Sequence, residues 1–241
     1  MESMRALVFA LAIGVAAMFA GEARAAGGAF VVDDAAVDEP GACKVESSLS
    51  FGSNRDFIGL STPACVVPFF KPVELGVNIL RTRQDGEWGT SLIPKAKMNI
   101  LPVETGKLGL AIATGSAFDV LTGEYTGSFV NVPMTYTFSE TFKANLNGGW
   151  IYERRTNRHF LSYGVGVEWI PMKPFTLIAE VFGVAGQADS RSATDPRFQA
   201  GLRVTPIETI DFDVIYGRNI TGENANWITI GMNVRFPPPA K

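Results

Sequence analysis

Residues 227–236 read WITIGMNVRF, and apolar residues occupy every second position of this stretch. Successive side chains of a β-strand point to opposite faces, so the stretch predicts a strand with one apolar and one mostly polar face. The apolar face holds Ile228, Ile230, Met232, Val234 and Phe236. The other face holds Trp227, Thr229, Gly231, Asn233 and Arg235.

The same alternation recurs along the chain upstream of this strand, in units of about ten residues separated by turn residues. Ten such units lie between Val73 and Phe236, and residues 44–52 and 57–67 form an earlier hairpin. The sequence therefore predicts about twelve strands, and an even number returns both ends of the chain to one side of a membrane.

The period alone does not decide which face is inside, because a soluble sandwich buries its apolar face whereas a membrane barrel turns it toward lipid.

Three features favour the barrel. Short connections, near 68–72, 102–106, 139–141, 171–174 and 206–209, alternate with longer ones, near 83–89, 119–124, 154–159, 185–196 and 218–226. Aromatic residues gather at strand ends on the apolar face, as in the two aromatic belts of membrane proteins. The last strand ends on the aromatic Phe236, followed by five residues.

The predicted fold class is therefore all-β, a transmembrane antiparallel up-and-down β-barrel of about twelve strands, preceded by a cleaved signal peptide. An apolar run over 6–20 and the small residues Ala23 and Ala25 predict cleavage after Ala25. We expect a signal peptide over 1–25, a periplasmic N-terminal segment over 26–43, the barrel over 44–236 and a tail over 237–241. The expected location is the bacterial outer membrane.

The two cysteines, Cys43 and Cys65, lie equally far from the centre of the first hairpin, near Asn54. Opposed residues on adjacent strands bring their Cβ atoms within bridging range, and the periplasm permits oxidation. We predict a Cys43–Cys65 disulfide, with two unpaired thiols as the alternative.

The sequence offers little catalytic chemistry. Its one histidine, His159, lies beside a predicted loop, and Ser162 lies three residues further on. Alternation points Ser162 into the lumen, and no nucleophile elbow is present, so we expect a solvated histidine and no catalytic residue. A chain with one histidine cannot form a zinc site that needs two or three histidine ligands. No phosphate-binding glycine motif follows a predicted strand. We expect no enzyme activity, metal or cofactor, and a net charge of −3 with pI 5.3 gives no case for nucleic-acid binding.

The polar face of the strands is the candidate functional surface, because in a barrel it lines the lumen. Its charged residues could form a selective pore, or could pair across the interior and narrow or plug it. The lumen-lining candidates are Glu46, Glu74, Lys95, Lys97, Lys143, Glu168, Glu180, Arg203, Asp211 and Asp213.

Several short motifs resemble the outer-membrane transporter family named after the MetA pathway of phenol degradation. They are FVVDDAAVDEPG (30–41), PVELGVNI (72–79), NLNGGW (145–150), IAEVFG (178–183), QAGLR (199–203) and IDFDVIYG (210–217). The resemblance covers residues 30 to 236, and Glu74 and Glu180 match acidic residues that recur in the family's strands. It implies an outer-membrane barrel that passes small, often hydrophobic or aromatic compounds.

The leading hypothesis is passive passage of small molecules through the outer membrane. Expected partners are outer-membrane lipid, the barrel-assembly machinery during biogenesis and a small-molecule permeant, with no nucleic acid. One alternative is a structural or adhesive barrel that binds partners through external loops such as 185–196. The other is an outer-membrane lipid enzyme that depends on His159.

Overall fold

The computed structural model describes residues 28–186, 196–222 and 224–238. The predicted signal peptide, residues 1–25, and the end of the predicted tail lie outside these ranges. The described residues contain no helix that is long and apolar enough to cross a membrane.

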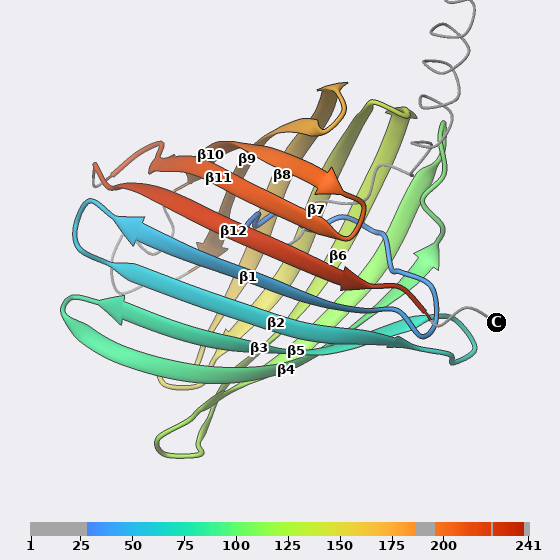
Figure 1. The fold of residues 1–241 in the computed structure, drawn as a ribbon. Coiled ribbons are helices and arrows are strands. Elements are labelled where there is room, and N and C mark those ends of the chain that lie inside the picture. Colours follow the sequence, from blue (N-terminus) through green and yellow to red (C-terminus); the bar gives the residue numbers. More distant parts are fainter. Residues whose placement is uncertain (1–27, 187–195, 223, 239–241) are drawn as a thin grey trace, which may run out of the picture.

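The described residues form twelve antiparallel strands that close into one barrel, in which each strand pairs with its neighbours in the sequence and β1 pairs with β12 (Figure 1). The strands are β1 (Cys43–Gly52), β2 (Phe57–Val67), β3 (Val73–Gln84), β4 (Glu87–Leu101), β5 (Leu108–Asp119), β6 (Tyr125–Ser139), β7 (Phe142–Glu153), β8 (Arg158–Met172), β9 (Phe175–Gly186), β10 (Arg197–Ile207), β11 (Ile210–Asn219) and β12 (Asn226–Phe236). The predicted fold class is confirmed, and the barrel begins at Cys43, one residue before the predicted boundary.

The two ends of the barrel differ in what they carry. The end that holds the start of β1 and the end of β12 is called the termini end below, and the opposite end is called the loop end. At the termini end, β6–β7, β8–β9 and β10–β11 are joined by two residues each. The loop end carries the connections β1–β2, β3–β4, β5–β6, β7–β8, β9–β10 and β11–β12.

The predicted alternation of connection lengths is wrong at two places. A long loop was predicted near 83–89, but β3 and β4 are joined by Asp85 and Gly86 alone, with φ of 51° and 87°. Asp-Gly favours the tight hairpin turn in which both central residues have positive φ, so the strands continue almost to the turn. Conversely, the connection predicted near 102–106 spans all six residues between β4 and β5.

The two faces of the barrel wall have the reverse of the polarity found in soluble proteins. Leu161 and Val214, on the outer face, are 64% and 59% exposed, whereas the inward-facing Asp211 and Asp213 are 1% exposed each. Soluble proteins almost never bury carboxylates while exposing large aliphatic side chains. A wall of this kind is stable when the outer face contacts lipid chains.

Aromatic side chains lie on the outer face near both ends. Near the loop end, the Tyr152 and His159 rings stack with centroids 5.0 Å apart, and Trp150 stacks on His159 at 5.5 Å. Near the termini end, the Phe138 and Phe142 ring centroids are 5.4 Å apart. This arrangement fits two interfacial belts.

The predicted disulfide is present. Cys43 and Cys65 are paired across β1 and β2, with an S–S distance of 2.09 Å. It closes the first hairpin at the termini end, where the chain enters the barrel wall. The residues that precede β1 run inside the ring of strands, as the blue trace in Figure 1 shows.

Candidate functional site: the barrel interior

Residues 28–36, called the internal segment below, lie in the lumen and are held there by side chains of the wall. The Glu180 carboxylate accepts hydrogen bonds from the backbone N–H groups of Val31, at 3.0 Å, and Val32, at 3.2 Å. Gln199 donates to the same carboxylate at 2.7 Å. One buried carboxylate therefore binds two consecutive backbone amides of the segment.

Further along the internal segment, side-chain amides and one side-chain hydroxyl of the wall form hydrogen bonds with the backbone, as a neighbouring strand would. The Asn147 side chain accepts from the N–H of Asp33 at 2.9 Å and donates to its carbonyl at 2.6 Å. Ala35 donates its N–H to Thr135 at 2.9 Å, and its carbonyl accepts from Asn99 at 2.6 Å. These side chains satisfy backbone groups that would otherwise be buried without partners.

Inward-facing glycines make room for the side chains of the internal segment. A Cβ atom on Gly164 would lie 2.8 Å from Cγ2 of Val32, and one on Gly166 would lie 3.4 Å from Cβ and Cγ1 of Val32. Phe30 packs with the buried Ile178 and Ile215. Gly164 and Gly166 therefore leave the space in the lumen that Val32 occupies.

The internal segment differs from its predicted position. The sequence placed residues 26–43 in the periplasm ahead of the barrel, whereas residues 29–36 contact the barrel interior. Residues 37–42 lead out to the termini end, where Gly41 donates to the Val66 carbonyl at 2.8 Å and Ala42 accepts from the Val66 N–H at 2.8 Å.

The ten predicted lumen-lining residues all lie on the inner face, in the half of the barrel nearer the termini end. Nine of them are buried and Lys95 is partly exposed. Most of the charged side chains are arranged in clusters that mix both signs.

One cluster lies on β10, β11 and β12. Arg203 contacts Asp213 through two hydrogen bonds, Nε to Oδ1 at 2.7 Å and Nη2 to Oδ2 at 3.0 Å. Asp211 pairs with Arg235 and also accepts from Thr205 at 2.8 Å. A second cluster lies on β1 and β3, where Lys44 lies 3.3 Å from Glu46 and 3.0 Å from Glu74. The ion pairs of both clusters join residues of the wall, and the Arg203 guanidinium also lies over the ring of Phe30 in the internal segment, 5.4 Å from its centroid.

A third cluster joins the wall to the internal segment. Lys97 of β4 lies 2.9 Å from Asp33 and 3.4 Å from Asp34. Lys143 of β7 lies 3.2 Å from Glu168 and 3.9 Å from Asp34. The charge of the internal segment is thus complementary to the wall that surrounds it.

The loop-end half of the interior has a different lining. Cross-strand neighbours on the inner face there include Phe129, Ile151 and Phe160, which follow one another across β6, β7 and β8. Below a rim that carries Glu153 and Arg158, apolar residues outnumber polar ones on the inner face of this half, where Ser50, Thr82, Ser91, Ser162 and Arg197 also lie. Its apolar members are Ile58, Leu60, Leu80, Ile93, Phe129, Ile151, Phe160, Phe182, Val184 and Trp227.

The geometry separates the two residues considered for hydrolysis. His159 stacks in the outer aromatic cluster, whereas Ser162 occupies an inward position opposite Gly149. They lie on opposite faces of β8, so they do not form a nucleophile–base pair. Within the described ranges, no group of three or more His, Cys, Asp or Glu side chains is placed to hold a metal ion.

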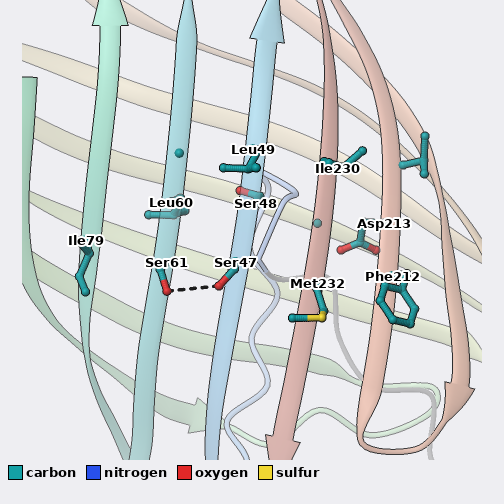
Figure 2. A pocket seen from close by; sticks show the side chains of 13 residues that line it. Ser47, Ser48, Leu49, Leu60, Ser61, Ile79, Phe212, Asp213, Ile230 and Met232 are labelled. Atoms are coloured by element: carbon teal, nitrogen blue, oxygen red, sulfur yellow. Dashed lines mark hydrogen bonds between the residues drawn. The ribbon is translucent and has the colours of Figure 1, made fainter. Parts of the chain in front are cut away.

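A hollow of 690 Å³ lies over β11, β12, β1 and β2, bordered by Phe212, Met232 and Ile79 (Figure 2). Its side chains belong mainly to the outer face, and the Ser47 and Ser61 hydroxyls there are 3.2 Å apart and bond to each other. Because that face is apolar, lipid chains would fill the hollow. It is a feature of the lipid-facing surface and not an entrance to the lumen.

Sequence reasoning missed the internal segment, the uncharged wall residues that bind it, namely Asn99, Thr135 and Asn147, and Gln199, which binds Glu180. A usable signal was present. The segment carries two adjacent aspartates in a chain whose predicted lumen contained several lysines, and its FVV stretch follows the expected cleavage point closely.

The closed ring and the reversed polarity define a transmembrane β-barrel of the porin-like class. The chain belongs to the family described as "Uncharacterised conserved protein UCP029691", whose model matches residues 14–236. No curated protein sequence matches the chain.

Solved outer-membrane barrels have the same architecture. The NanC porin is similar with a TM-score of 0.62 at 8% identity, over 79% of this chain and 98% of the porin. The KdgM porin gives 0.59 at 8% identity, over 80% and 99%. The COG4313 outer membrane channel from Pseudomonas putida F1 gives 0.61 at 12% identity, over 84% and 98%. What these proteins share with the chain is the fold.

Proposed function

We propose that the chain is an outer-membrane channel through which small, largely apolar molecules pass by diffusion. The observation that carries this proposal is the division of the lumen. An apolar half at the loop end leads to a charged half that is occupied by a short internal segment and not by a packed domain. Apolar lining favours solutes that release ordered water when they enter.

The surroundings of the barrel follow from the same proposal. The termini end faces the periplasm, because single-chain bacterial barrels keep both termini there. Outer-membrane lipid covers the apolar outer face, and the barrel-assembly machinery engages the last strand, which ends at Phe236. A signal peptide over 1–25 delivers the chain to the periplasm. The link to phenol degradation stays a prediction, because the family model that matches is that of UCP029691.

Planar-bilayer recordings test the proposal with a matched pair of proteins, the mature chain and a variant that lacks residues 28–36. The intact chain should be closed most of the time. The deletion variant should show steady current, with a mean conductance at least roughly tenfold higher than that of the intact chain. A segment that binds in the lumen with a free energy of about 1.4 kcal/mol would keep the intact chain closed about ten times as often as open.

A second variant tests the same point in the full-length chain. Gly164→Leu places a side chain where Val32 now lies, so it should raise the conductance without any deletion. Folding of each variant is checked by circular dichroism and by heat-modifiable migration on gels. Folded deletion and Gly164→Leu barrels that pass neither ions nor solutes would overturn the channel.

Such a result would support the alternative of a sealed barrel that binds partners through external loops. That alternative rests on the connection at 185–196, most of which lies outside the described residues. The separation of His159 from Ser162 argues against a lipid enzyme, for which a lipase assay on the same preparation is the direct test.

A further inference from the structure

The carboxylates of the internal segment occupy a position in the lumen that is built for anions. The Lys97 ammonium, whose residue is 6% exposed, lies within hydrogen-bond distance of Asp33 and Asp34, and Lys143 approaches Asp34 from the other side. The lysines come from β4 and β7, on opposite sides of β5 and β6. Two cationic groups thus converge on one pair of carboxylates.

Neutral hydrogen-bonding groups complete this site. Thr135 and Asn147 bind the backbone on either side of Asp34, and Asn145 links Thr135 to Glu168 through hydrogen bonds of 2.8 and 2.7 Å. If the internal segment leaves, these groups and the two lysines are uncovered together. Lys97 then faces the lumen without its two contacting carboxylates, whereas Lys143 keeps Glu168, so the open lumen favours an anion that replaces the aspartates at Lys97.

The apolar lining of the loop-end half restricts what such an anion is attached to. Phe129, Ile151 and Phe160 lie on the same three neighbouring strands that carry Thr135, Asn147 and Glu168, closer to the loop end. A solute that enters from the loop end meets these apolar side chains first and the lysines second. The apolar lining therefore favours a solute with an apolar body, and the lysines favour one that also carries a carboxylate.

We infer that the Asp33–Asp34 pair is a built-in mimic of the channel's ligand, and that this ligand is a small apolar carboxylate. Its carboxylate takes the place of the aspartates at Lys97 and Lys143, and it reaches them by passing along the apolar lining of the loop-end half. Binding of the ligand and presence of the internal segment in the lumen therefore exclude each other. This inference rests on the proposed channel function and names its substrate class.

Cross-linking in the full-length protein tests the competition. In Val32→Cys/Gly164→Cys, the two Cβ atoms would lie near the 3.7 Å found for an ideal Cβ on Gly164, which suits a disulfide. A mild oxidant should therefore join the segment to the wall. Millimolar benzoate should slow this reaction severalfold, whereas benzyl alcohol, of similar size without charge, should not. Equal rates with both compounds would overturn the inference.

Solute entry into liposomes tests the charge preference in the variant that lacks residues 28–36. Benzoate should enter faster than benzyl alcohol by roughly tenfold after correction for leakage through bare lipid, as expected for one charge-assisted hydrogen bond. Lys97→Gln in this background should abolish the preference, and Lys97→Arg should retain it. The matched control is Lys107→Gln, because Lys107 is exposed in the β4–β5 connection and pairs with Glu104.

The two proposals fail in different ways. If the deletion variant passes both solutes with no preference, and Lys97→Gln changes nothing, the channel stands and the carboxylate ligand is wrong. If a folded deletion variant passes neither solute nor ions, the channel itself is wrong.

Discussion

Arg203 and Lys97 are both buried cations on the inner face of the barrel, but their counter-charges come from different places. Arg203 binds Asp213, which is its cross-strand neighbour on β11. Lys97 has Glu74 as its cross-strand neighbour, yet Glu74 lies 3.0 Å from Lys44, and Lys97 contacts the aspartates of the internal segment. The first arrangement stabilises the wall itself, whereas the second makes part of the wall dependent on a segment that can leave.

The largest effect is expected from Arg203→Met. The substitution removes one of the cations that pair with the buried Asp211 and Asp213. Breaking a buried ion pair in this way lowers the free energy of unfolding by about 3–5 kcal/mol. Urea titration of the barrel in lipid vesicles, followed by tryptophan fluorescence, measures the free energy of unfolding. Arg203→Met/Asp213→Leu should recover part of the loss. A loss below about 1 kcal/mol would show that the cluster contributes little to the wall.

The covalent link at the termini end should come next. Cys43 and Cys65 are 22 residues apart, and closing a loop of that length lowers the entropy of the unfolded chain enough to stabilise the fold by about 3 kcal/mol. Cys43→Ser/Cys65→Ser should lose this amount in the same urea titration. Reduction of the wild-type protein is the matched control and should give the same loss. An unchanged midpoint in both would refute the expectation.

The smallest effect, and the sharpest test of the comparison, is that of Lys97→Met in two backgrounds. In the full chain it should cost about 1–3 kcal/mol, because the buried Asp34 and the partly exposed Asp33 lose a charged partner. In the variant without residues 28–36 it should cost nothing or stabilise the barrel. Arg203→Met should keep most of its cost in the shortened variant, because its ion pairs lie in the wall and only its contact with Phe30 is lost. Equal costs for Lys97→Met in the two backgrounds would mean that its partners lie in the wall.

The barrel could be predicted from the sequence because each strand is specified locally. Alternation over ten residues assigns Asp211, Asp213 and Arg203 to the inner face without any knowledge of their partners. The β3–β4 turn is tighter than its charged neighbours indicate, because Asp85 and Gly86 both adopt the positive φ that a two-residue hairpin turn requires.

The internal segment could not be placed in the same way. Its backbone forms hydrogen bonds with side chains of the wall that are 64 to 149 positions away in the chain. Backbone N–H groups are the same in every non-proline residue, so the segment carries no periodic pattern that would indicate its partners. Only its two aspartates are specific to the site. They can be matched to Lys97 and Lys143 once both lysines are known to face the same part of the lumen.

The anchoring of β1 has a consequence for how the barrel would close again. Because residues 37–42 connect the segment to a strand end fixed by the Gly41–Val66 hydrogen bond and the disulfide, a displaced segment cannot diffuse away. A short tether keeps such a segment at an effective concentration in the millimolar range. A solute present at much lower concentration must bind at Lys97 and Lys143 more tightly than the Asp33–Asp34 pair does to hold the lumen open. Once that solute has passed, the tethered segment returns without a partner protein or an energy source.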